Sequence, residues 1–264
     1  MNEEKISRIK VAVMNNFDKS PEQYQAFENE HGFFCALNGL LLSRMKLPVG
    51  SRVLDVGCGT GVSTLQIADV VPESRVWGLD ISSAMLDQAR INAGDSDRLT
   101  FVHGDAGRLA DHFSIEFDAV IYSASIFLIP DYEESLKQAR RLLSPTGKVG
   151  VTFMDGLYDE AGNNLVAEAD RMAGEGVSLS RAVKLREFRA TFEKLFPRSE
   201  EWTEDFRLAL PVIRQFFSVP AMSAGLFPRI VYEERLKKVE RLFAHLPGDV
   251  LFRWVLMAGS SLPG

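Results

Sequence analysis

The sequence predicts an α/β fold with a doubly wound, mostly parallel sheet and helices packed on both of its faces. Three observations support this prediction. Short apolar runs alternate with segments of helical period from residue 53 to residue 153. A glycine-rich turn follows the first apolar run, and an acidic residue follows each of the next two. A final apolar run at residues 250–257 comes after a long helical segment and is expected to join the sheet as an antiparallel last strand.

The glycine-rich turn follows the strand predicted at residues 53–56. Its glycines, Gly57, Gly59 and Gly61, stand at alternate positions, where they allow a tight backbone turn and the close approach of a ligand. The dinucleotide fingerprint needs glycine at its first, third and sixth positions, but the sixth position counted from Gly57 holds Val62. No Gly-Lys-Ser/Thr follows, so the turn is not a phosphate-binding P-loop either.

Helices and strands alternate after this turn. The predicted helices are residues 62–70, a segment starting after Ser82, and residues 132–143. The predicted strands are residues 75–80, 99–103, 117–122 and 148–153. The first helix ends before Pro72, and Ser82 is the expected N-cap of the second. A Ser-Pro-Thr-Gly turn at residues 144–147 precedes the fifth strand.

The segments on either side of this alternation are predicted to be largely helical. Residues 1–47 carry apolar residues at helical spacing, with a break before a helix that starts with Ser20 as N-cap and Pro21 at its first position. The leucine-rich residues 37–42 are expected to belong to a helix that packs on the sheet edge. Beyond residue 155, scattered glycines indicate a mobile linker or a helical insertion. Further helices are expected at residues 185–195, 211–217 and 232–244, with a strand-like stretch at 201–210.

Composition narrows the class of protein. The chain is 46% hydrophobic and 25% charged, as globular proteins are, and no apolar run approaches the ~18 residues that span a membrane. The N-terminus lacks a secretory pattern, so we expect a cytoplasmic protein without a membrane partner. Two cysteines, Cys35 and Cys58, are too few for a disulfide framework or a zinc site, and no metal is expected. A net charge of −6 argues against a nucleic-acid partner.

Five features occur in order along the chain: an acidic strand end, a three-glycine turn, two later acids, and a proline–glycine turn before the fifth strand. In this combination, residues 48–153 resemble class I S-adenosylmethionine-dependent methyltransferases of the small-molecule type. The resemblance implies a Rossmann-like core that binds S-adenosyl-L-methionine and releases S-adenosyl-L-homocysteine. It implies that Asp55 helps to hold the methionine end and that Asp105 accepts from the adenine amine. Asp80, about twenty residues after Gly57, is suited to the ribose hydroxyls.

The predicted cofactor-binding residues come from the tips of the first four strands and from the N-terminal segment. They are Phe17, Tyr24, Asp55, Gly57, Cys58, Gly59, Asp80, Ile81, Met85, Gly104, Asp105, Ala106, Tyr122 and Ser123. The predicted organisation has four parts: an N-terminal helical cap, the cofactor-binding core, a helical insert with one strand that forms a lid over the acceptor site, and the final strand. These parts are residues 1–47, 48–155, 156–248 and 249–264.

No catalytic residue is predicted, because displacement at a sulfonium methyl group needs mainly alignment and the exclusion of water. His31, His103 and His112 have suitable ordinary pKa values for a base, but a structural role explains each of them better. The sequence after the fourth strand, residues 123–126, lacks the Asn/Asp-Pro-Pro-Tyr/Phe motif of enzymes that methylate DNA amines or glutamine. There is no Pro-Cys nucleophile and no set of several thiols for arsenite.

The expected acceptor is therefore a small molecule, either apolar or carboxylated, methylated on oxygen or carbon. Aromatic and Met residues after residue 157 form either an apolar acceptor wall or a packed helical core. They are Met172, Phe188, Phe192, Phe216, Phe217, Met222 and Phe227. Two alternatives stay open: a non-catalytic protein that binds the cofactor and serves a partner, and a nicotinamide-dependent oxidoreductase. The oligomeric state is not predicted.

Overall fold

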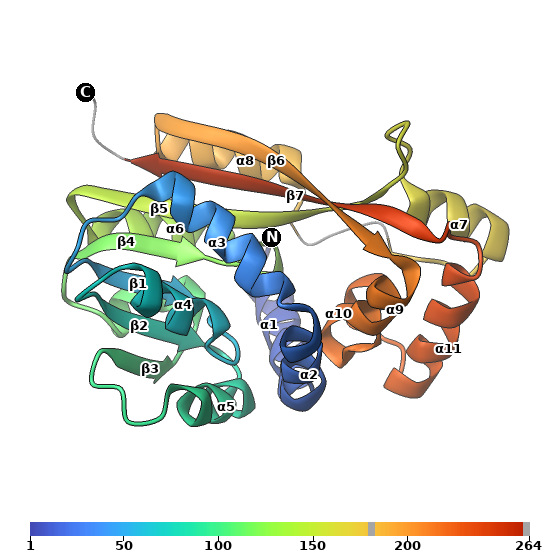
Figure 1. The fold of residues 1–264 in the computed structure, drawn as a ribbon, viewed down its shortest axis with the longest axis horizontal. Helices are drawn as coiled ribbons and strands as arrows, with labels where there is room; N and C mark the ends of the chain where they lie inside the picture. The colour runs from blue at the N-terminus through green and yellow to red at the C-terminus, as the bar shows by residue number, and fades with distance from the viewer. Residues whose placement is uncertain (179–182, 261–264) are drawn as a thin grey trace.

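A computed structural model describes residues 1–178 and 183–260. Its centre is one seven-stranded sheet with the order β3-β2-β1-β4-β5-β7-β6 (Figure 1). The strands are β1 (Arg52–Val56), β2 (Arg75–Asp80), β3 (Leu99–His103), β4 (Phe117–Tyr122), β5 (Leu143–Tyr158), β6 (Arg198–Ala209) and β7 (Asp249–Ser260). Strands β1 to β5 pair in parallel, and β7 is antiparallel to both of its neighbours. This sheet confirms the predicted fold class.

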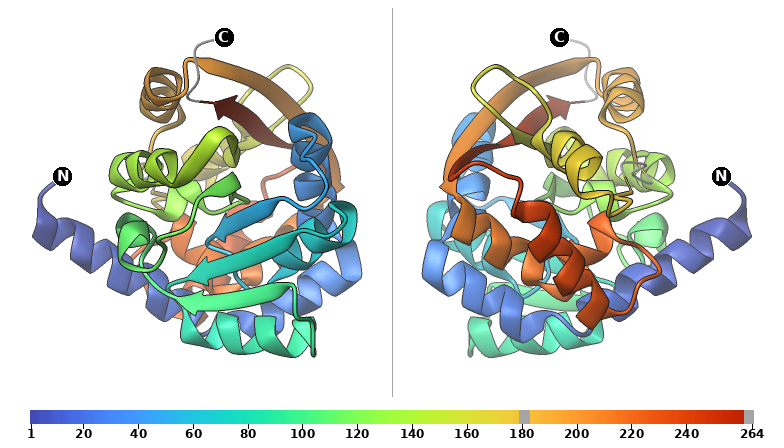
Figure 2. Two further views of the ribbon diagram at one scale, coloured as in Figure 1. Left: turned by 90° about the vertical axis from the view of Figure 1, so that its left-hand side faces the viewer. Right: turned by 90° about the vertical axis from the view of Figure 1, so that its right-hand side faces the viewer.

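Helices cover both faces of the sheet. They are α1 (Glu3–Phe17), α2 (Pro21–His31), α3 (Phe33–Met45), α4 (Val62–Val70), α5 (Ser83–Ala93), α6 (Tyr132–Leu142), α7 (Leu165–Ala173), α8 (Leu185–Leu195), α9 (Leu210–Ser218), α10 (Pro220–Leu226) and α11 (Tyr232–Phe243), with short 3₁₀ helices η1 (Ala106–Asp111) and η2 (Ile126–Leu128). Helices α3 and α4 pack together on one face, and α6 and α8 pack together on the other (Figure 2). The helices and strands predicted between residues 62 and 142 are confirmed to within a residue or two.

Helix α3 does not pack on the sheet edge, as its sequence led us to expect. It lies on the face of the sheet over β5 and β7, which are inner strands. Gly150 of β5 makes this close approach possible, because a Cβ atom at that position would collide with the Met45 side chain at the end of α3. Ser20 also differs from expectation: it stands at the N-cap position of α2, but its hydroxyl donates to Asn16 O instead of capping the helix.

Residues 156–176 are not a linker: they contain the end of strand β5 and helix α7, which agrees with the helical alternative. Strand β5, predicted to end at residue 153, continues to Tyr158 because it pairs with β7 along this length, with a register shift between Met154 and Gly156. Strands β5, β7 and β6 thus form a long antiparallel ribbon that extends beyond the parallel strands, with α7, α9, α10 and α11 near its far end (Figure 1). The four-part division of the chain stays a prediction, and its residues 179–182 and 261–264 lie outside the described residues.

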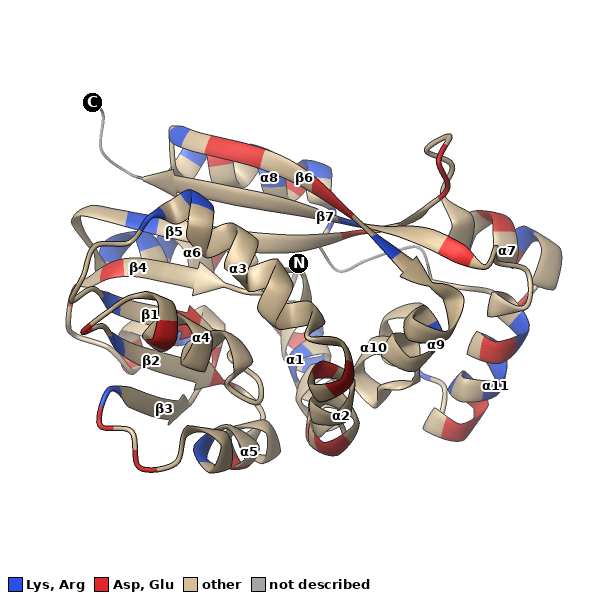
Figure 3. Cartoon of the chain, viewed as in Figure 1, with Lys and Arg blue, Asp and Glu red and all other residues tan. Residues whose placement is uncertain are grey.

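Strand β6 forms one edge of the sheet and exposes alternate residues along its length. The strand carries four acidic residues, Glu200, Glu201, Glu204 and Asp205, and red segments mark the acidic residues of β6 in Figure 3. Charged side chains on an edge strand disfavour pairing with the strand of another molecule. One of them, Asp205, is held by a bidentate pair with Arg253 of β7, at 2.8 and 2.7 Å.

The turn between β1 and α4 uses its three alternate glycines as the sequence predicts. Gly57, Gly59 and Gly61 have φ angles of +74°, +55° and +83°, in the left-handed region that favours glycine. The N–H groups of Gly57 and Cys58 both donate to Leu79 O of β2, at 2.7 and 3.1 Å. The turn is therefore fixed against the neighbouring strand.

An aromatic cluster joins the ribbon, α9 and the N-terminal helices. The ring of Phe216 on α9 lies between 5.0 and 6.3 Å, centroid to centroid, from five other Phe rings. These are Phe27, Phe33, Phe34, Phe217 and Phe252. Phe216 and Phe217 are therefore core residues. Phe188, Phe192 and Phe227 are also buried, at 0 to 1% exposure, while Met172 is exposed.

We predict that Phe216→Ala lowers the free energy of unfolding by about 3–5 kcal/mol, because it removes a ring that is 2% exposed and leaves a cavity among aromatic neighbours. Ile91→Ala is the control: this side chain on α5 is 73% exposed, and its loss is expected to change stability by less than about 0.5 kcal/mol. Urea unfolding followed by circular dichroism measures both. Equal losses in the two variants would contradict the role of the cluster.

We also predict that Gly57→Ala destabilises the protein more than Gly50→Ala does. Both glycines have a positive φ, of +74° and +76°, so both substitutions carry the same backbone strain of about 1–2 kcal/mol. Only at Gly57 would the new Cβ meet Ser125 Cβ, at 2.5 Å, whereas nothing lies within 4 Å at Gly50. A urea midpoint for Gly57→Ala equal to that for Gly50→Ala would show that the turn and Ser125 can separate at no cost.

Candidate functional site

A cleft lies where the parallel strands end, beneath α1 and α2. In Figure 1 the arrowheads of the parallel strands point toward these two helices. The cleft holds about 730 Å³ of space not filled by atoms, including the part open to solvent. Its lining residues are Lys10, Val13, Phe17, Tyr24, Gly57, Gly59, Leu79, Asp80, Ile81, Met85, Gly104, Asp105, Ala106, Ser123, Ala124, Ser125, Leu128, Ile129, Pro130 and Met222. Most of the predicted site residues therefore lie around one space.

Asp80 ends β2 and lies beside the glycine turn. Its carboxylate accepts from Gly59 N through Oδ2 and from Ser82 N through Oδ1, both at 2.8 Å. Burial raises the pKa of Asp80, and these two N–H donors oppose that rise. Because each carboxylate oxygen has two lone pairs, both oxygens can still accept another hydrogen bond from the cleft.

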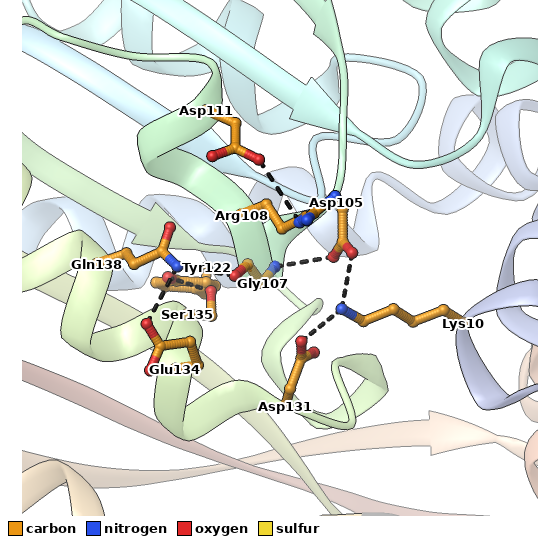
Figure 4. A network of polar contacts seen from close by, with 10 residues as sticks. All are labelled: Lys10, Asp105, Gly107, Arg108, Asp111, Tyr122, Asp131, Glu134, Ser135 and Gln138. Carbon is orange, nitrogen blue, oxygen red and sulfur yellow. Dashed lines mark hydrogen bonds and ion pairs between the residues drawn. The ribbon is translucent and has the colours of Figure 1, made fainter. Parts of the chain in front are cut away.

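Asp105 follows β3 and belongs to a network of charges at one end of the cleft (Figure 4). Its Oδ1 accepts from Gly107 N at 2.9 Å, and its Oδ2 accepts from Lys10 Nζ at 2.7 Å. The same ammonium group also contacts Asp131 Oδ2, from the residue that precedes α6. The other oxygen of Asp131, Oδ1, is buried without a hydrogen-bond partner among the described residues. One lysine is thus shared between two carboxylates.

Asp55 lies behind the glycine turn and does not line the cleft. It is 0% exposed, and its Oδ2 accepts from the Ser63 and Thr64 hydroxyls of α4, both at 2.6 Å. Its Oδ1 is buried and has no hydrogen-bond partner among the described residues. Burial raises the pKa of Asp55 to about 6. A buried carboxylate oxygen without a donor is costly, and Oδ1 of Asp55 could still accept a hydrogen bond from a donor that reached it.

Two further predicted residues do not line the cleft. The Tyr122 side chain is fully buried, and its hydroxyl is hydrogen-bonded to Ser135 Oγ of α6 at 2.8 Å. The Cys58 side chain is also buried, and its Sγ packs against Gly78 of β2 so closely that a Cβ there would lie 2.8 Å away. Side chains alternate between the faces of a strand, which explains why Tyr122 points to α6 while the next residue, Ser123, lines the cleft.

The aromatic residues predicted from the N-terminal segment do reach the cleft. Phe17 ends α1 and Tyr24 belongs to α2, and the Tyr24 ring stacks on Phe34 at 4.8 Å. Burial and the nearby carboxylates of Glu28 and Asp80 raise the pKa of Tyr24 well above its usual range. The phenol is therefore neutral at physiological pH.

The three histidines considered as bases lie elsewhere. His31 Nε2 is paired with Gln215 Oε1 at 2.6 Å, and His103 Nε2 with Ile81 O at 3.0 Å. The His112 ring packs against Gly104, where an added Cβ would lie 2.5 Å from Nε2. None of the three lines the cleft in the described part of the chain.

Several residues that line the cleft were not predicted from the sequence. Lys10 and Val13 precede Phe17 by seven and four positions, so helical spacing places all three on one side of α1. This spacing is the signal that could have revealed Lys10. Leu128, Ile129 and Pro130 come from the connection between β4 and α6, which carries no recognisable motif. Met222, from α10, is the one member of the proposed apolar wall that lines the cleft.

Among the described residues, 1–178 and 183–260, there is neither a membrane-spanning helix nor a cluster of metal ligands. No helix among them is both long enough and apolar enough to cross a membrane. No three or more His, Cys, Asp or Glu side chains within the same ranges are grouped so that they could hold a metal ion.

Comparison with known proteins points to one family. Residues 53–147 match a family model described as a methyltransferase domain. A demethylmenaquinone methyltransferase of Staphylococcus saprophyticus is 30% identical over 150 residues, which are 52% of this chain and 64% of the relative. A trans-aconitate 2-methyltransferase of Acidovorax sp. is 28% identical over 204 residues, 75% of this chain and 76% of the relative. The chain thus spans less than two thirds of the demethylmenaquinone methyltransferases that it matches.

Solved structures share the fold. The YcgJ protein of Bacillus subtilis superposes with a TM-score of 0.62 at 16% identity, covering 87% of this chain and 99% of that one. A phosphoethanolamine N-methyltransferase of Haemonchus contortus, solved with S-adenosylhomocysteine, has a TM-score of 0.54 at 21% identity over 86% of this chain and 52% of its own. Residues 53–147 therefore match a methyltransferase domain, within a Rossmann-like fold that these solved structures share.

Proposed function

We propose that this protein is a methyltransferase that binds S-adenosyl-L-methionine and methylates a small molecule. The observation that carries the proposal is the placement of two carboxylates, Asp80 and Asp105, at the tips of adjacent strands in the same cleft as the glycine turn. A cofactor with a ribose diol and an adenine amine needs acceptors at two separated points, and ligands of doubly wound sheets bind at the carboxyl ends of the strands.

The residues present fit this cofactor. Gly57 and Gly59 line the cleft with backbone alone, so a ligand can lie close to the turn. Asp80 would hold the ribose hydroxyls, Asp105 the adenine amine, and Ile81 and Met85 would contact the adenine faces. Asp55, with its unpartnered oxygen behind the turn, would receive a donor from the methionine end, directly or through a water molecule. The remaining predicted contacts, including Gly104, Ala106 and Ser123, lie in the same cleft.

The bound cofactor supplies a methyl group on a sulfonium leaving group. The protein then has to align the acceptor and exclude water, and both tasks suit a cleft covered by two helices. Lys10, Tyr24, Asp80 and Asp105 are the titratable side chains in the described lining, and Tyr24 is a neutral phenol. We assign no general base among them, and a phenol or quinol acceptor would release its proton to solvent.

The lining favours an uncharged, apolar acceptor over a carboxylated one. Apolar side chains from α1, from the connection after β4 and from α10 make up much of the wall; they are Val13, Phe17, Leu128, Ile129, Pro130 and Met222. Lys10 is the one cation in the described lining, and two carboxylates already neutralise it. A di- or tricarboxylate such as the acceptor named for the Acidovorax relative would lack a counter-charge, and an unpaired buried charge is costly.

The first test is cofactor binding to an Asp80→Asn variant. Removing the negative charge at this position is expected to raise the Kd for S-adenosylhomocysteine about 10- to 100-fold, because hydrogen bonds to a charged acceptor contribute about 1.5–3 kcal/mol. Asp97→Asn, at an exposed position before β3, serves as the control and leaves the Kd unchanged. Titration calorimetry measures both, with unfolding midpoints to check the fold. An unchanged Kd in Asp80→Asn would remove Asp80 from the ribose site.

Transfer of a labelled methyl group from S-adenosylmethionine to a panel of acceptors tests the activity itself. We expect label in apolar phenolic or quinol acceptors and not in polycarboxylates. Tight cofactor binding with no labelled product across the panel would favour the alternative of a non-catalytic cofactor-binding partner. Binding of a nicotinamide cofactor in place of S-adenosylhomocysteine would favour an oxidoreductase and overturn the proposal.

Binding of S-adenosylhomocysteine is also expected to depend on pH through Asp55. Its pKa is raised to about 6, so the carboxyl is protonated below that pH and ionised above it. A ligand ammonium group nearby favours the ionised form, so affinity should fall as the pH drops through 6, by about tenfold per unit at most. Calorimetry between pH 5 and pH 8 measures this slope. Asp55→Asn should flatten it, and an equal slope in that variant would assign the effect to another group.

A further inference from the structure

Helix α1 covers the cleft but has no buried residue of its own. Its first turns project away from the body of the molecule (Figure 2). Polar side chains anchor its second half. Asp18, which follows the helix, accepts from the Ser82 hydroxyl at 2.6 Å, and Asn16 accepts from the buried Arg235 of α11 at 3.0 Å. The third anchor is Lys10, the one among these that lines the cleft.

Lys10 meets its two carboxylates in a partly buried setting. The side chains of Lys10, Asp105 and Asp131 are 16%, 27% and 17% exposed, so solvent screens their charges less than at the surface. Gly107 makes room for this group, because a Cβ there would collide with Asp131 and lie 2.7 Å from Lys10 Nζ. Figure 4 shows the ammonium group between the two acids. Such a fit indicates a specific arrangement and not a chance surface contact.

The ammonium group determines where the Asp105 carboxylate points. One of its oxygens is fixed by Gly107 N and the other by Lys10 Nζ. Without Lys10, two carboxylates would face each other with no cation between them, and their repulsion would turn Asp105 away from its present orientation. Since each oxygen keeps a free lone pair in the network, the carboxylate can still accept from a group in the cleft.

We infer that Lys10 is a positioning residue for base specificity: it holds Asp105 as an acceptor toward the exocyclic amine of adenine. This inference rests on the proposed function. The 6-amino group of adenine donates a hydrogen bond, whereas the 6-oxo group of hypoxanthine accepts one. A carboxylate held in place accepts from the first and repels the second, and such polar discrimination is much stronger than discrimination by shape.

The test compares two ligands, S-adenosylhomocysteine and S-inosylhomocysteine, by titration calorimetry. The wild-type protein should prefer the adenosyl ligand by about 100-fold or more. In Lys10→Met this preference should fall to about a tenth of the wild-type ratio, because Asp105 is no longer fixed. Lys10→Arg, which keeps the charge, should recover most of the ratio. Lys5→Met is the matched control, since Lys5 is exposed on the same helix, and its ratio should equal that of the wild type.

The ratio separates base recognition from a merely structural role. If Lys10 only anchors α1, Lys10→Met weakens both ligands equally, and the unchanged ratio overturns the inference while the proposed function stands. A lower Kd for the adenosyl ligand in Lys10→Met would show that Lys10 competes for Asp105, which also overturns the inference. Failure of the wild-type protein to bind either ligand would instead overturn the proposed function together with it. Circular dichroism spectra confirm that each variant is folded.

Discussion

The carboxylate of Asp80 is the interaction on which the arrangement of the cleft depends. One of its oxygens holds the glycine turn through Gly59 N, and the other holds the start of α5 through Ser82 N. The Ser82 hydroxyl in turn donates to Asp18 at the end of α1. A single side chain at the tip of β2 therefore connects the glycine turn with the start of α5 and, through Ser82, with the end of α1. The same carboxylate lines the cleft, so one side chain both stabilises the cleft and is proposed to bind the ribose.

Much of the core could be predicted from sequence because its signals are local. The turn needs glycine at three alternate positions, and all three have positive φ angles. The first three strands are short apolar runs with an acid at or near the end. Because these strands are parallel, their carboxyl ends, and with them the acids, lie on the same side of the sheet. Asp80 and Asp105 could be placed in one cleft by this reasoning alone. The direction of a side chain within a strand could not, and Tyr122 shows why: a shift of one residue changes the face.

The rest depends on contacts between distant segments. Lys10 and Asp105 are 95 positions apart, and no local pattern links them. The extension of β5 to Tyr158 depends on pairing with β7, more than ninety positions later. Asp55 was expected to face a ligand, but two hydroxyls of α4 hold one of its oxygens behind the turn. The sequence pattern of an acidic residue before a glycine turn does not determine which way its side chain points.

The position of β7 has a consequence for how the chain reaches this fold. Strand β7 contains the last described residues, yet it lies inside the sheet between β5 and β6. Until β7 has been synthesised, β5 is therefore an open edge, and β6 has no neighbour in the sheet. Pairings so far apart in sequence form slowly, and open edges in the meantime attract other strands. The acidic residues along β6 disfavour its pairing with other copies of the same strand while its neighbour is missing.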